Sequence, residues 1–320
     1  MADDGEFHDF YKYTPSKAAA SVFIVLFLLT STFHAFQLAK PRVWFLLSRS
    51  WLAAVFEIVG YAARIVSSTE APLFKDTPYI IQTLFLLLAP ALFAASVYML
   101  LGRLIAALHA DHFAIVRRTW MTKIFVTGDI LSFVVQGMGG GIMASGTPSN
   151  LSLGQKIVIG GLVIQLLFFG FFILASIIFH RRMTANPTTE SMSLCFSWHK
   201  HLFALYIASA LIMTRSIFRV IEYIQGADGE LLSNEVYLYV FDAALMLILM
   251  VLLNVVHPRE IAELLNGDKG LNFGDLEMRR GGRRRNRPGG TGSEQNEANG
   301  RVSFVDTAYA RHAIATRGLA

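Results

Sequence analysis

Cysteine and charge are both scarce in this chain of 320 residues. Cys195 is its one cysteine, which excludes an intramolecular disulfide and a metal site built from several thiolates. Charged residues make up 16% of the sequence, whereas soluble domains carry about a quarter. Hydrophobic residues make up 54%. This balance excludes an ordinary soluble domain and indicates a membrane protein.

The sequence motifs of several enzyme and pump classes are also missing. No glycine-rich loop is followed by Lys-Ser or Lys-Thr, which excludes an ATP-binding loop and primary active transport by this chain alone. A nucleophile elbow is absent, and only His34 lies well inside a long apolar run, which disfavours a membrane metallohydrolase. The last apolar run lacks the lysine that would bind retinal as a Schiff base. We therefore expect a protein that is not an enzyme and that has no cofactor and no metal.

Seven long apolar stretches dominate the chain. Each has about the length that a helix needs to cross a bilayer, roughly 20 residues. Pro90 lies inside the third stretch, where we expect it to kink the helix without ending it. The predicted spans are residues 18–39, 44–66, 79–108, 120–143, 155–179, 201–223 and 235–256. The sequence thus predicts an all-α integral membrane protein with a bundle of seven transmembrane helices.

Basic residues give this bundle an orientation. They gather in the first, third and fifth connections between spans and in a run of arginines between Arg279 and Arg287. Basic connections stay in the cytosol, so we expect the N-terminus outside and the C-terminus in the cytosol. No basic region precedes a short apolar core at the N-terminus, so we interpret the first run as a retained helix. Asn150 begins a glycosylation sequon in a connection that this orientation places outside.

The chain is predicted to have three parts. An extracellular N-terminal segment covers residues 1–17, and the membrane domain covers residues 18–258. A basic, largely disordered cytosolic tail covers residues 259–320. Its arginine and glycine content resembles that of RNA-binding segments, but we favour contacts with anionic lipid head groups over nucleic acid, because the tail directly follows a membrane span.

Charged and polar side chains recur at helical spacing inside the apolar runs. Glu57, Tyr61 and Arg64 are separated by four and three residues and so share one helix face. Lipid solvates charge poorly, so we expect these stripes to converge on the bundle interior. The predicted site comprises Glu57, Tyr61, Arg64, Asp129, Gln136, Arg215, Arg219, Glu222, Tyr239 and Asp242.

Three roles are open for these residues. The acids and arginines could neutralise one another and hold the helices together. Alternatively, Glu57, Asp129 and Asp242 hold the cationic group of a substrate, while the arginines orient the acids or receive a phosphate. A proton relay is the third role. Most of the charges lie in the outer half of their spans, which predicts a polar vestibule that opens outward.

Glycines and glutamines in the fourth and fifth spans indicate helix contacts. Gln136 and Gln165 are expected to form interhelical hydrogen bonds. Glycines allow helices to approach closely, which we expect at Gly137, Gly139, Gly140, Gly141, Gly160 and Gly161.

Five separated motifs resemble those of the fungal RTA-like family, the lipid-translocating exporters named for resistance to aminocholesterol. They are EIVGYAAR at 57–64, QTLFLLLAPALFAASVY at 82–98, GDILSFVVQGMGGG at 128–141, RSIFRVIEY at 215–223 and VVHP at 255–258. The resemblance implies a seven-helix protein of the plasma membrane, the endoplasmic reticulum or the vacuole. It also implies export or flipping of amphipathic lipids, such as sphingoid long-chain bases, and tolerance of lipophilic toxic compounds. One branch of the family is linked to porphyrin uptake.

A membrane transporter for amphipathic lipids or lipophilic small molecules is therefore the leading interpretation, with the plasma membrane as the expected location. An acidic polar cavity would suit an ammonium head group while the tail remains in hydrocarbon. The alternative is a receptor-like sensor of membrane lipid stress or lipid asymmetry that acts through protein partners. The basic tail fits this role as well.

Overall fold

The structure is a computed structural model, and it describes residues 15–39, 44–69, 76–143, 147–188, 191–192, 198–226, 229–256 and 261. The chain divides into two units, Met1–Gly270 and Leu271–Ala320. The second unit lies outside the described residues. So do Cys195, most of the N-terminal segment and the predicted basic tail apart from residue 261.

Helices account for all the regular elements in the described ranges. The long ones are α1 (Lys17–Ala39), α2 (Trp44–Thr69), α3 (Asp76–Ala107), α4 (Arg118–Met143), α5 (Pro148–Ala185) and α7 (Trp198–Gln225). The remaining ones are η1 (Asp111–Phe113), α8 (Glu230–Ser233), α9 (Glu235–Leu238), η2 (Tyr239–Ala244) and α10 (Leu245–Val255). Because α9, η2 and α10 run on as one stretch, seven helical segments are long and apolar enough to cross a membrane. The predicted seven-helix membrane bundle is confirmed.

The fifth span is longer than predicted. Residues 155–179 were expected, but α5 runs from Pro148 to Ala185. Thr147 has an extended backbone, and Pro148 occupies the first helical turn, where its missing N–H costs nothing. At the other end, Arg182 lies in the last turn, where a cation is favourable. The apolar run therefore predicted only the part of α5 whose side chains suit lipid. The polar ends of the helix lie outside that run.

The last span is irregular in a way that the sequence did not predict. Between α9 and α10, the six residues of η2 form a π-helix, which winds more widely than an α-helix. Such segments are rare and occur often at functional sites. Asp242 lies in this segment.

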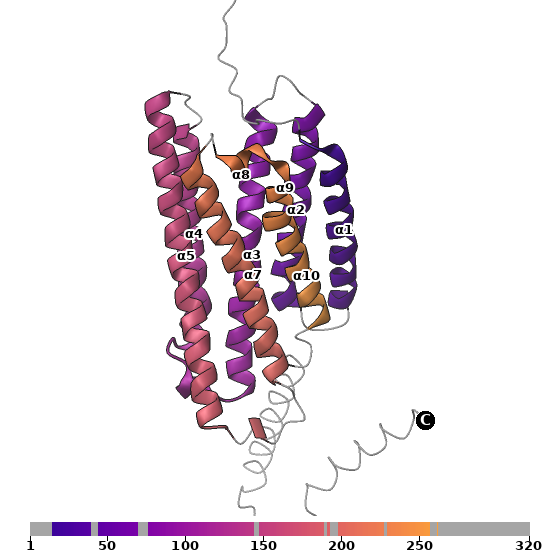
Figure 1. The fold of residues 1–320 in the computed structure, drawn as a ribbon. Helices are drawn as coiled ribbons and strands as arrows, with labels where there is room; N and C mark the ends of the chain where they lie inside the picture. The colour runs from indigo at the N-terminus through magenta and orange to yellow at the C-terminus, as the bar shows by residue number, and fades with distance from the viewer. Residues whose placement is uncertain are drawn as a thin grey trace, which may run out of the picture. The chain divides into compact units, whose positions relative to one another are not determined.

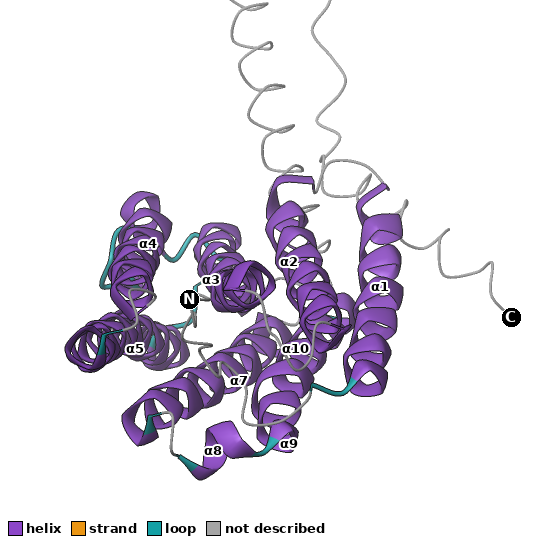
Figure 2. Ribbon diagram, turned by 90° about the horizontal axis from the view of Figure 1, so that it is seen from above, coloured by secondary structure: helices purple, strands orange, loops and turns teal. Residues whose placement is uncertain are grey.

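Neighbouring helices in the chain pack against one another from α1 to α5. Figure 2, a view from above, shows α7 between the group of α3, α4 and α5 and the group of α1, α2 and α10. Helix α7 contacts α3, α5 and α10, and α10 packs on α1. In Figure 1, α1 begins at the end of the bundle where α8 and α9 lie, and α10 ends at the opposite end. Which end faces the cytosol stays a prediction.

The outer faces of the helices are apolar. On α1, Val22, Leu29 and Phe33 are 55%, 63% and 54% exposed, whereas His34 is fully buried. This pattern suits a helix that faces lipid on one side. The charged side chains lie on the inner faces, as predicted: Glu57, Arg64, Asp129, Arg215, Glu222 and Asp242 are all buried.

Two glycines bring α4 and α5 into close contact. A Cβ on Gly139 would lie 2.7 Å from the carbonyl oxygen of Gly154, and one on Gly161 would lie 2.9 Å from that of Ser132. The prediction of close approach is confirmed at these two positions. It is wrong at the others, where a Cβ would meet nothing within 4 Å: Gly137, Gly140, Gly141 and Gly160.

Candidate functional site

Two arginines of α7 meet one aspartate of η2 in the bundle interior. Asp242 accepts hydrogen bonds from Arg215 through Oδ1 and from Arg219 through Oδ2. The two arginines are four residues apart and lie on one face of α7, so both reach the same carboxylate. Arg219 Nη1 also donates to Glu222 Oε2 over 2.9 Å. We call Arg215, Arg219, Glu222 and Asp242 the arginine cluster.

Asp242 is thus neutralised by two guanidinium groups. Its side chain is fully buried, and that of Arg215 is 3% exposed. Removing one member of such a pair would leave an uncompensated buried charge, which is strongly destabilising. The cluster therefore stabilises the packing of α7 on η2. The geometry favours this stabilising role for Asp242 over direct contact with a substrate cation.

Pro90 supplies a partner for Arg215. A proline has no backbone N–H, so in α3 the carbonyl of Leu86, four residues earlier, lacks its helical donor. Arg215 Nη2 donates to this Leu86 carbonyl oxygen over 2.5 Å. Pro90 remains inside α3 without ending it, as predicted. The proline therefore creates an acceptor inside the bundle, and that acceptor holds the arginine cluster against α3.

Glu57 of α2 faces the arginine cluster without being bound to it. Its side chain is fully buried. In the part of the chain that the structure describes, neither carboxylate oxygen has a hydrogen-bond partner. Asp242, Arg215 and Arg219 all lie within electrostatic range of it. A buried carboxylate with no partner is costly and uncommon, and such groups concentrate at functional sites.

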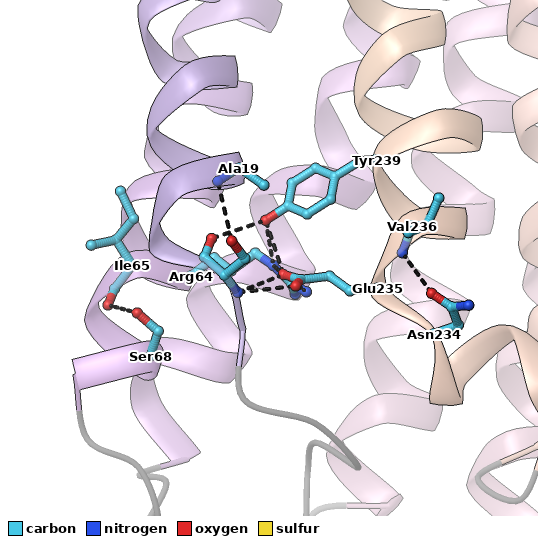
Figure 3. Close-up of polar contacts among 9 residues, drawn as sticks. Ala19, Arg64, Ile65, Ser68, Asn234, Glu235, Val236 and Tyr239 are labelled. Atoms are coloured by element: carbon cyan, nitrogen blue, oxygen red, sulfur yellow. Dashed lines mark hydrogen bonds and ion pairs between the residues drawn. The ribbon is translucent and has the colours of Figure 1, made fainter.

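A second polar group joins α1, α2 and α9. Figure 3 shows Arg64, Glu235 and Tyr239 pointing toward one another. Arg64 Nη2 lies 2.9 Å from Glu235 Oε1, and the Tyr239 hydroxyl donates to the same oxygen over 3.0 Å. The backbone N–H of Ser16, at the start of α1, donates to both Glu235 oxygens over 2.9 and 3.0 Å. We call Ser16, Arg64, Glu235 and Tyr239 the α9 joint.

Local capping fixes the position of Glu235. The side chain of Asn234 accepts a hydrogen bond of 3.1 Å from the backbone N–H of Val236, which starts α9 (Figure 3). Glu235 is not among the predicted site residues. Its spacing of four residues before Tyr239 is the signal that could have identified it, because this spacing puts both on one helix face.

Tyr61 lies between the α9 joint and Glu57. It is fully buried one helical turn after Glu57, and its hydroxyl has no hydrogen-bond partner among the described residues. Its ring stacks on those of Phe23 and Tyr239, with centroids 6.0 and 6.1 Å apart. The structure thus brings eight predicted residues into two adjoining groups: Glu57, Tyr61, Arg64, Arg215, Arg219, Glu222, Tyr239 and Asp242.

Asp129 and Gln136 of α4 lie in a different environment. The Tyr98 hydroxyl lies toward the Asp129 carboxylate, although no hydrogen bond of regular geometry joins the two. Gln136 Nε2 donates to Gln165 Oε1 over 3.2 Å, which confirms the predicted interhelical contact. Among the described residues, no hydrogen bond or ion pair connects Asp129 or Gln136 to the arginine cluster. The ten predicted residues therefore do not form one continuous site.

The charged groups are closed to solvent in this conformation. Glu57 and Asp242 have no exposed surface, so the predicted outward vestibule is not open here. An open groove of about 760 Å³ lies elsewhere, between α5 and α7. It is lined by Ile177, His180, Arg181, Thr184, Ala185 and Tyr206, none of them a predicted site residue.

The glycosylation sequon lies in a helix. Asn150 was expected in a connection, but it lies in the first turn of α5, and Ser152 Oγ donates to the carbonyl oxygen of Ser149 over 3.0 Å. Glycosylation of Asn150 stays a prediction.

Comparison with known proteins identifies the family of this chain. The family model described as RTA1 like protein matches residues 50–264, a range that holds every predicted site residue. The chain belongs to the RTA1-like family. Protein RTA1 of Saccharomyces cerevisiae is 38% identical over 282 residues, which cover 81% of this chain and 87% of that protein. No solved structure matches the chain at a significant level.

Two further RTA1-like relatives carry names that refer to lipids. The lipid-translocating exporter-like protein RTA1 of Leptosphaeria maculans is 28% identical over 275 residues, covering 78% of this chain and 50% of that protein. The sphingoid long-chain base transporter RSB1 of Saccharomyces cerevisiae is 26% identical over 269 residues, covering 73% of this chain and 69% of that protein.

Proposed function

We propose that this protein moves amphipathic lipids with an amine head group, such as sphingoid long-chain bases, across the membrane. The observation that carries the proposal is Glu57, a fully buried carboxylate with no hydrogen-bond partner among the described residues. An ammonium group would supply the counter-charge that this carboxylate lacks. The names of the relatives support lipids as the substrate class.

The surroundings of Glu57 suit the two ends of such a lipid. Tyr61, Phe23 and Phe27 place aromatic rings beside the polar interior, and α1 presents apolar side chains at its outer face. The head group would bind at Glu57 while the hydrocarbon chain stays among apolar side chains and lipid.

Reconstitution tests the proposal. Purified full-length protein is placed in liposomes, and the transbilayer movement of fluorescently labelled phytosphingosine is compared with that in vesicles without protein. We expect faster movement with protein and a loss of most of the gain in Glu57→Gln. Correctly folded protein that gives no acceleration would contradict the transport function for this lipid.

A cellular test addresses the finer parts of the proposal. We expect action at the plasma membrane and a contribution to tolerance of toxic amphiphiles. Cells that lack the protein should then grow less well with added sphingoid base, and wild-type protein should restore growth. A response of the cell to lipid stress without any lipid movement in vesicles would favour the receptor-like sensor instead.

A further inference from the structure

We infer that Glu57 is a proton-exchange site: it carries a proton in the absence of lipid and releases that proton when a lipid ammonium group binds. The inference rests on the proposed transport function. It adds a source of energy, because exchange of a proton for an organic cation couples lipid movement to a pH gradient.

The first argument is a count of buried charges. Among the described residues, five charged side chains meet in this region: Glu57 from α2, the three residues Arg215, Arg219 and Glu222 from α7, and Asp242 from η2. Three carboxylates and two guanidinium groups leave one negative charge when all five are ionised. Tyr61, the other titratable group beside Glu57, is neutral in its ordinary state. A net charge buried in a low-dielectric interior is unfavourable, so this region needs one further cation.

The second argument is that Glu57 is where this cation is missing. Asp242 uses both oxygens on the two arginines, and Glu222 accepts from Arg219. Glu57 alone in the group has two oxygens without a partner among the described residues. The four other charges cancel, so three features coincide at Glu57: complete burial, no hydrogen-bond partner among the described residues, and a charge of its own that no neighbour neutralises.

The third argument is that a proton and an ammonium group exclude each other here. A protonated carboxyl group is neutral and no longer attracts a cation, whereas an ionised carboxylate beside a bound ammonium group is already compensated. Binding of the lipid on one side of the membrane thus releases one proton from Glu57 to that side. When the lipid leaves on the other side, the carboxylate takes up one proton there. One positive charge moves in each direction, and no net charge crosses.

One-for-one exchange has a quantitative consequence. Each pH unit across the membrane supports about tenfold accumulation of the lipid on the acidic side, because a tenfold proton ratio is exchanged for a tenfold lipid ratio. The probe must keep its charge, since a primary amine can also cross a bilayer unaided in its neutral form. A labelled long-chain trimethylammonium lipid meets this requirement, because it has no proton to lose.

Asp129 offers a matched control. It is also a buried carboxylate without a regular hydrogen bond, but it faces Tyr98 and no arginine of the cluster is bound to it. Asp129→Asn replaces a buried carboxyl group by an amide, as Glu57→Gln does, and leaves the arginine cluster intact. Retained folding of each variant is checked by its thermal unfolding in detergent.

The experiment follows the trimethylammonium lipid and the internal pH in vesicles that contain full-length protein. With an acidic interior, we expect wild type and Asp129→Asn to accumulate the lipid inside and to raise the internal pH. Glu57→Gln should move the lipid to the same extent with and without the gradient. The inference is wrong if wild type moves the lipid faster than protein-free vesicles by the same factor with and without the pH gradient. It is also wrong if Glu57→Gln keeps the full response to the gradient. If neither wild type nor either variant moves the lipid faster than protein-free vesicles do, the proposed transport function fails, and the inference fails with it.

Discussion

The carboxylate of Glu235 binds the backbone N–H of Ser16, although 219 residues separate the two in the chain. The contact brings the first turn of α1 to the start of α9. Arg64 of α2 completes the joint with an ion pair of 2.9 Å to the same carboxylate. Helix α1 otherwise exposes much of its apolar surface, so this polar joint fixes the position of its first turn.

Neutralising Glu235 should therefore destabilise the bundle. In Glu235→Gln, the guanidinium group of Arg64, whose side chain is 1% exposed, loses its ion pair with Glu235. We expect a loss of about 3 kcal/mol in the free energy of unfolding, at the lower end for a broken buried pair. The measurement is thermal unfolding in detergent.

An exposed ion pair provides the control for Glu235→Gln. Asp111 and Arg118 lie 3.5 Å apart with side chains that are 56% and 42% exposed. Asp111→Asn should cost less than about 1 kcal/mol, because water screens this pair. Equal effects of the two substitutions would show that the α9 joint does not stabilise the fold.

Asp242 and Glu57 should respond in opposite ways to neutralisation. Asp242→Asn removes the carboxylate that Arg215 and Arg219 share, which leaves Arg215 without an ion pair among the described residues and should lower the unfolding temperature strongly. Glu57→Gln replaces a buried carboxyl group that has no hydrogen-bond partner among the described residues, so stability should be unchanged or higher. Both unfolding temperatures are measured in the same detergent.

The double variant adds a sharper measurement of the coupling between these two acids. Without Asp242, Arg219 keeps its ion pair with Glu222, and Glu57 is the other described carboxylate near the two arginines. We therefore expect Glu57→Gln to be clearly more harmful in the Asp242→Asn background than alone. Additive effects would show that the two side chains do not share the arginines.

Adjacent glycines of α4 should differ in their tolerance of a methyl group. In Gly139→Ala, the new Cβ would lie 2.7 Å from the Gly154 carbonyl oxygen, so α4 and α5 must separate, at a cost of about 1–3 kcal/mol. In Gly140→Ala, the Cβ meets nothing within 4 Å, and alanine favours the helix. Thermal unfolding of both variants provides the comparison. A larger loss in Gly140→Ala would contradict the helix contact described here.

Removal of residues 274–320 should separate transport from sensing. This segment contains the arginine run and lies outside the described residues. We expect the shortened protein to move labelled phytosphingosine in liposomes as fast as the full chain, because the candidate site lies in the helices. If the shortened protein keeps transport but cells lose their response to lipid stress, the receptor-like sensor gains support.

Composition and periodicity were sufficient for much of the site. The spacing of Glu57, Tyr61 and Arg64 put them on one face of α2, and all three are buried. Nothing in the spacing showed which acid pairs with which arginine, because such pairing joins helices far apart in the chain. Arg64 pairs with Glu235 across 171 residues, and Arg215 pairs with Asp242 across 27. Asp129 also fits the polar pattern, yet it lies apart from the arginine cluster.

The sequence by itself determined that this chain forms seven apolar helices with charged inner faces, since lipid excludes ions and the helical period sets which side chains share a face. Only the tertiary structure decided that Asp242 is shared by two arginines while Glu57 has no hydrogen-bond partner in the part of the chain that the structure describes. Helix packing fixes these distances, and a difference of a few ångströms separates a neutralised carboxylate from one that needs a cation.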